Sequence, residues 1–182
     1  MSHIVHMIVN KIAEDLNTAL ITNVSSSDPA RAAWVKAYRF QDSPKKYPIY
    51  VSVVPGNPDE PTLEHGRIDI GEDLERLGIY IPSGEVGGGH LWWRRGRIKI
   101  GCFLLDEGYE EDEAADVAQT VLGRVEYYAE RINVSSLVDD YGERAHGNVF
   151  IFASNFFEGG GPDDKYIWRG EVRWQVLTQR PL

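Results

Sequence analysis

An apolar stripe in residues 114–132 constrains the fold more than any other feature of the sequence. Its apolar side chains recur every three or four residues, at Ala114, Val117, Ala118, Val121, Leu122, Val125, Tyr128, Ala129 and Ile132. This is the spacing of one face of an α-helix, with acidic residues at the first turn and Arg131 in the last. Directly upstream, residues 94–105 alternate as a strand does. One face of that strand would carry Ile98, Ile100, Cys102 and Leu104, and the other Arg95, Arg97, Lys99 and Gly101. The helix is therefore expected to pack on a sheet.

Further elements flank this pair. Residues 4–20 repeat apolar side chains at Ile4, Ile8, Ile12, Leu16 and Leu20, which predicts a second amphipathic helix. Residues 34–40 and 47–54 are strand-like, and the polar turn sequence between them favours a hairpin. Residues 148–154 and 166–177 predict a closing pair of strands, separated by an acidic, glycine-rich hairpin tip at 158–164.

A long stretch from about residue 55 to residue 93 lacks a regular pattern. It contains Pro55, Pro58, Pro61 and Pro82, together with the glycine run 87–89, and neither residue type favours a central strand. Short strands are conceivable at residues 67–70 and 78–81. We interpret this stretch as an insertion, because a long connection inside a compact domain is usually functional or mobile.

The order is thus helix, strand pair, insertion, strand, helix, strand pair. Strands that are mostly joined without crossover helices predict an α+β fold, with a mixed or mostly antiparallel sheet flanked by two helices. A chain of 182 residues with 42% hydrophobic residues can bury one good core. We expect a single domain over residues 1–182, with the insertion at about 55–93.

Charge and cysteine content exclude several classes of protein. A net charge of −9 opposes general binding to nucleic acid or to an anionic membrane through the whole surface. No apolar run approaches the roughly 20 residues that span a bilayer, and the first residues do not resemble an export signal. The only cysteine, Cys102, allows no internal disulfide and no multi-cysteine metal site, which suits a reducing cytoplasm.

No pattern of catalytic or metal-binding residues stands out, and we expect neither an enzyme nor a cofactor. The five histidines lack convergent ligand spacing, and Cys102 lies on an apolar strand face, as a core thiol would. The acidic run 106–116 fails the spacing of a calcium loop and better fits a helix start. The run Gly87-Gly88-Gly89-His90 leads into a strand rather than a helix, unlike a phosphate loop. Asp69, Glu171 and Lys99 could serve a metal-dependent nuclease, but nothing in their spacing requires it.

Two charged segments suggest binding instead. Trp92, Trp93, Arg94, Arg95 and Arg97 place aromatics beside cations, and these residue types dominate buried protein contacts. Glu110, Glu111 and Asp112 supply opposite charges a few residues further on. Opposed surfaces on one protomer suit a head-to-tail contact that closes a ring. The alternative is that the tryptophans cover the core and the arginines are solvated.

The order of these elements resembles the tail terminator (tail completion) proteins of long-tailed bacteriophages, the lambda type. The resemblance lies in a helix ending at Leu20, a hairpin around Tyr38 and residues 50–53, a strand at 97–103, a helix at 114–132 and a closing strand at 168–176. It covers most of the chain and depends on pattern and length rather than on a short motif.

The resemblance implies a virion protein that forms a homo-hexameric ring. Such a ring caps the tail tube at its head-proximal end, stops polymerisation of the tube protein, and presents a surface to the head-tail connector or neck. The protein would be made in the host cytoplasm, would use binding energy alone, and would recognise neither a nucleic-acid sequence nor a membrane.

Three alternatives remain open from the sequence. A head-tail connector or other neck protein shares the size and charge. A small hydrolase could use a metal on the acidic run or the thiol of Cys102. A host-directed binding module could use its acidic surface to mimic nucleic acid.

Overall fold

The computed structural model describes residues 3–38, 48–56, 66–67, 90–104, 108–160 and 166–181. The elements in chain order are α1 (Ile4–Asn23), a 3-10 helix (Pro29–Ala32), β1 (Trp34–Ala37), β2 (Ile49–Pro55), β3 (Gly66–Arg67), β4 (His90–Cys102), α3 (Glu111–Ala129), β5 (Arg144–Gly160) and β6 (Tyr166–Arg180). Both predicted helices are confirmed. The closing strands are longer than the sequence predicted. No helix in the described ranges is long and apolar enough to cross a bilayer.

The strands form one mixed sheet. Its order is β1-β2-β4-β6-β5, and β3 pairs with β4 off this path. Only the β1–β2 pair is parallel, and the other pairs are antiparallel. The predicted α+β class, with two helices and a mostly antiparallel sheet, is confirmed.

The predicted hairpin between residues 34–40 and 47–54 is wrong. β1 and β2 run parallel, with Val35 opposite Val51 and Ala37 opposite Val53. Alternation of apolar and polar residues fixes which face a strand buries, but it carries no information on the direction of its neighbour. Directly after β1, Tyr38 adopts a φ of 59°, which lies in the left-handed region.

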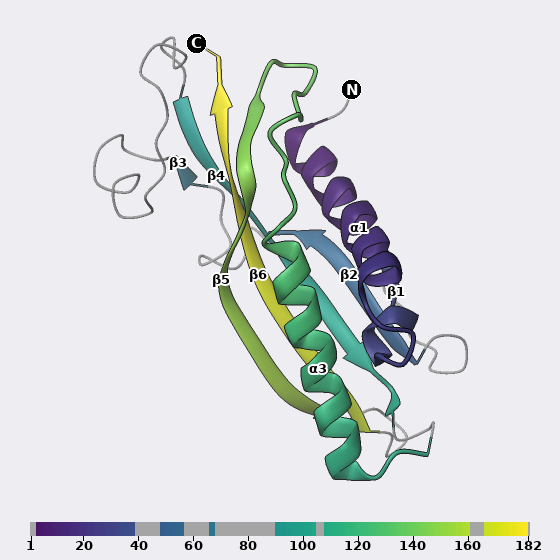
Figure 1. Ribbon diagram of the computed structural model, residues 1–182. Coiled ribbons are helices and arrows are strands. Elements are labelled where there is room, and N and C mark those ends of the chain that lie inside the picture. Colours follow the sequence, from purple (N-terminus) through teal and green to yellow (C-terminus); the bar gives the residue numbers. More distant parts are fainter. Residues whose placement is uncertain are drawn as a thin grey trace.

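Both helices cover the same face of the sheet (Figure 1). The buried stripe of α1 and the stripe Ala114, Ala118, Val121, Val125 and Ala129 of α3 pack there against the strands. From β4 this core takes Ile98, Ile100 and Cys102, as the alternation predicted. The opposite side of the sheet, here named the outer face, carries the residues of the other parity.

The predicted insertion ends earlier than residue 93, because β4 begins at His90 and includes Trp92 and Trp93. Within it, β3 pairs Gly66 with Trp93 and Arg67 with Trp92. The other short strands predicted at 68–70 and 78–81, and the glycine run at 87–89, lie outside the described residues.

Candidate assembly surface

The outer face of the sheet carries rows of charged side chains that the strand register brings together. Lys36, Ser52, Lys99, Glu171 and Asn155 lie in one row that crosses β1, β2, β4, β6 and β5. Residues directly opposite each other in neighbouring strands point to the same side of a sheet. The row is therefore directed away from the helices.

A second row places Arg97 of β4 opposite Arg173 of β6. Glu171 binds both arginines, since its carboxylate lies 3.6 Å from Nη1 of Arg97 and 2.9 Å from Nε of Arg173. In these and the adjacent rows, the described cations on the outer face are Lys36, Arg95, Arg97, Lys99, Arg169 and Arg173. The carboxylate among them is Glu171, so this side of an acidic protein is locally basic.

Arg95 extends the basic surface toward β5. Its Nε donates a hydrogen bond to Oε1 of Gln175 at 3.2 Å. Its guanidinium carbon lies 5.9 Å from the centre of the Phe152 ring. Phe150 and Phe152 are 42% and 36% exposed, which is unusual for phenylalanine. On the outer face, a cation and an aromatic ring thus come together at Arg95 and Phe152.

The two tryptophans of the predicted assembly segment point to opposite sides of β4. Trp93 has outer-face parity and is only 6% exposed. Trp92 is half-buried on the other side, where the guanidinium carbons of Arg94 and Arg180 lie 5.2 and 4.8 Å from its ring centre. Strand alternation therefore divides the segment, and Trp93 leaves little surface for contact with another chain.

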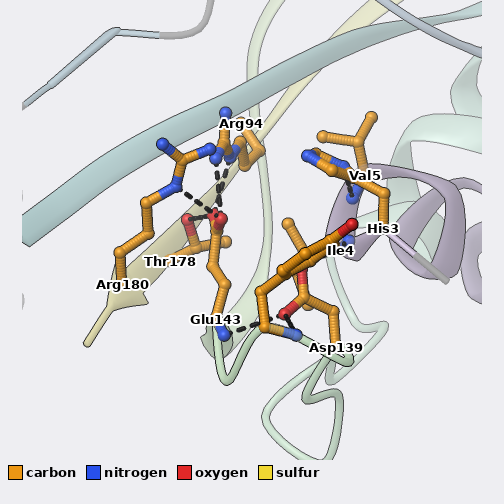
Figure 2. A network of polar contacts seen from close by, with 9 residues as sticks. His3, Ile4, Val5, Arg94, Asp139, Glu143, Thr178 and Arg180 are labelled. Atoms are coloured by element: carbon orange, nitrogen blue, oxygen red, sulfur yellow. Dashed lines mark hydrogen bonds and ion pairs between the residues drawn. The ribbon is translucent and has the colours of Figure 1, made fainter. Parts of the chain in front are cut away.

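Arg94 is used inside the protomer. It is 4% exposed, and its Nε and Nη2 donate to the two carboxylate oxygens of Glu143 at 2.7 and 2.8 Å (Figure 2). Thr178 and Arg180 donate to the same carboxylate. The expectation that Arg94 lies at the protein surface is corrected: its parity is that of Ile98, so it enters the helix side of the sheet and needs a buried counter-charge.

These contacts determine the protonation of Glu143. Burial alone would raise the pKa of its carboxyl, but the hydrogen bonds from Arg94, Thr178 and Arg180 and the charge of Arg94 outweigh that effect. The pKa is lowered from 4.5 to about 2. The carboxylate is therefore ionised at neutral pH, and it joins β4, β6 and the start of β5.

A second carboxylate anchors the start of α1 to the same region. Asp139 accepts a hydrogen bond from the backbone N–H of Ile4 at 3.1 Å through Oδ2, and from that of Glu143 at 2.9 Å through Oδ1. His3 caps the helix by accepting from the backbone N–H of Val5. Sequence reasoning missed both acids. The signal in the sequence was a pair of carboxylates four residues apart, Asp139 and Glu143, with a glycine between them. In the structure this glycine, Gly142, forms a turn with a φ of 79°.

The acidic residues Glu110, Glu111 and Asp112 begin α3, as predicted, and are exposed. The backbone N–H of Glu110 donates to Oε2 of Glu113 at 3.4 Å, which is half of a capping box. Because α3 packs on the helix side of the sheet, the outer face and these carboxylates belong to different sides of the protomer (Figure 1).

Cys102 is a core thiol, as predicted. It is 1% exposed, and burial raises its pKa to about 12, so it is protonated at neutral pH. Of the three residues considered for a nuclease, Lys99 and Glu171 are opposite each other in the β4–β6 register, and Asp69 lies outside the described residues. The described part of the chain contains no group of three or more histidines, cysteines or carboxylates placed to hold a metal ion.

The fold and this surface define an α+β protein with two helices on one side of a mixed sheet and a basic outer face. No family model matches the sequence, and no curated protein matches it. Among solved structures, the chain is similar to a chain from the virion of a native gene transfer agent particle, with a TM-score of 0.41 and 11% sequence identity. The match covers 92% of this chain and 97% of the other.

Proposed function

We propose that the protein is a structural virion component that self-associates head to tail into a ring, caps the tail tube and ends its polymerisation. One observation carries the proposal. The outer face of the sheet is basic in a chain of net charge −9, whereas the exposed start of α3 on the other side is acidic. Two complementary but different surfaces on one protomer support a heterologous contact, which closes into a ring when the rotation permits.

The contact residues are Lys36, Arg95 and Arg97 on the basic side and Glu110, Glu111 and Asp112 on the acidic side. Trp92, Trp93 and Arg94 support the contact residues indirectly. Their packing and the ion pair between Arg94 and Glu143 hold this end of β4 in position. The partners are further copies of the chain, the tail tube protein and the neck protein. The ring stands at the head-proximal end of the tail.

Charge reversal tests the head-to-tail contact. Lys36→Glu and Arg95→Glu on one side, and Glu111→Lys on the other, should each weaken association measured by light scattering after size exclusion. A mixture of Lys36→Glu and Glu111→Lys proteins should regain part of it. Glu14→Lys, at an exposed position of α1, is the matched control and should associate as the wild type does. Association of the wild-type protein should also fall with salt, because salt screens the attraction between the two surfaces.

Images of negatively stained particles, with and without purified tube protein, test the ring and its role. Rings that bind tube ends and stop their growth are expected. A strict monomer at every concentration, with no affinity for tube protein, would overturn the proposal. Rings that bind a neck or portal protein but not the tube would favour the connector role instead.

A further inference from the structure

The outer edge of β5 changes character at Phe150. Before that point, the segment that follows α3 covers it: the backbone N–H of Ala145 donates to the carbonyl of Leu137 at 3.0 Å, and that of Val149 to Ile132 at 2.9 Å. Beyond Val149, no residue in the described ranges bonds to this edge. β5 is the outermost strand there (Figure 1).

This open edge carries little of the usual protection. Natural edge strands carry lysines, prolines, bulges or covering segments, or they are short. Residues 145–157 contain no Asp, Glu, Lys, Arg or Pro, and residues 150–157 read Phe-Ile-Phe-Ala-Ser-Asn-Phe-Phe. One irregularity in the register falls between Ile151 and Ala153. From Ala153 to Gly160 the pairing with β6 is continuous, so the edge is regular and can accept another strand.

The opposite edge of the same sheet is β1, four residues long. Its direction follows from the pairings: β1 is parallel to β2, and the three antiparallel steps from β2 through β4 and β6 make β5 antiparallel to β1. Lys36 of β1 and Asn155 of β5 end the same outer-face row. A neighbour rotated about an axis along the strands would therefore place its β1 antiparallel beside β5, with both outer faces on one side.

We propose that the open edge of β5 pairs with β1 of a second copy, so that the sheets of neighbouring protomers join. The proposal takes only the cyclic arrangement from the proposed function. Joined sheets keep both outer faces on one side, so this backbone contact is an alternative to the contact between the outer face and the start of α3. Antiparallel pairing supplies main-chain hydrogen bonds, and residues 150–160 of the edge contain no cation that would repel Lys36, since their single charged residue is Glu158.

The test places a charge on the edge. Ser154→Lys, at an exposed position of the regular stretch, should weaken self-association about tenfold in sedimentation equilibrium, a loss of about 1.4 kcal/mol. Gln119→Lys, at an exposed position of α3, is the matched control and should stay within about twofold. Circular dichroism of both variants checks that each is folded. Equal association of Ser154→Lys and wild-type protein would overturn the proposal, as would a wild-type protein that stays monomeric.

Cross-linking identifies the partner strand. The variant with both Lys36→Cys and Asn155→Cys, treated with a short bismaleimide, should give a ladder of covalent oligomers, whereas each single variant should give none. Native Cys102 is buried and should not react. Dimers from Asn155→Cys alone would show β5 paired with β5 and overturn the assignment of β1. Open fibres that cross-link as expected would leave this inference standing and refute the ring. Rings whose assembly is insensitive to Ser154→Lys would support the proposed ring and refute the pairing of β5 with β1.

Discussion

Replacing Glu143 by glutamine should destabilise the protomer severely, because the change keeps the shape and removes a buried charge. The carboxylate accepts hydrogen bonds from Arg94, Thr178 and Arg180, and both Glu143 and Arg94 are less than 5% exposed. The variant would leave the Arg94 guanidinium buried without its counter-charge. Loss of one partner of a buried ion pair costs about 3–5 kcal/mol.

The pKa of Glu143 gives an independent estimate. Its folded pKa is lowered from 4.5 to about 2. At 1.36 kcal/mol per pKa unit, the ionised carboxylate contributes about 3 kcal/mol. Because the folded pKa lies below the unfolded one, this stability is fully present above about pH 4.5 and is lost as the pH falls toward 2. A domain is typically stable by only about 5–15 kcal/mol, so the effect is a large share.

Urea unfolding followed by tryptophan fluorescence measures both effects. The free energy of unfolding of Glu143→Gln should fall by about 3 kcal/mol at pH 7, and the difference from wild type should shrink between pH 4.5 and pH 2. The control is Glu14→Gln, which makes the same change at an exposed position of α1 and should change stability by less than about 0.5 kcal/mol. The pair Arg94→Met with Glu143→Leu should lose less than Glu143→Gln, since neither charge remains. A loss below about 1 kcal/mol for Glu143→Gln, or a difference from wild type that does not change with pH, would refute this reasoning.

Three further predictions concern the core. Gly96→Ala should destabilise by at least about 1–3 kcal/mol in urea unfolding, because a Cβ there would lie 2.2 Å from a buried indole ring, whereas Gly123→Ala on the exposed side of α3 should stabilise by up to about 1 kcal/mol. Leu16→Ala should cost about 2–5 kcal/mol in thermal or urea unfolding, and Ile21→Ala, at a position 46% exposed, should change stability little. Cys102 should stay unreactive toward a disulfide reagent at pH 8 until urea unfolds the protein, and rapid reaction of the native thiol would contradict its burial.

The parts of the fold that were predictable are those where one periodic face is buried. Three such patterns pack against one core: the stripe of α1, the stripe of α3, and the alternation of Ile98, Ile100 and Cys102 in β4. Periodicity locates a buried face, but it cannot give strand direction or order. This is why β1 and β2 were expected to form a hairpin, and why the position of β4 between β2 and β6 could not be inferred. The antiparallel pairing of β5 with β6 was predicted, because a short turn sequence joins them.

The candidate site was predictable only in part, for a related reason. Strand parity already separates Arg94 from Arg95 and Arg97, because Arg94 shares the face of Ile98. A cation on a core face requires a buried acid, yet its partner Glu143 is 49 residues away in the chain. Only the register of β4 with β6, and of β6 with β5, brings the two together. The basic rows of the outer face depend on the same registers.

The two groups of charges on this sheet therefore have different consequences for assembly. Around Glu143, one carboxylate receives four donated hydrogen bonds inside a single protomer, so this cluster stabilises the end of the sheet whether or not a partner is present. On the outer face, the described cations outnumber the carboxylate of Glu171, and repulsion among them falls when an acidic surface approaches. Association through that face should weaken as salt screens it, whereas backbone pairing along β5 should not. The salt dependence of assembly thus separates the contribution of the basic face from that of the strand edge.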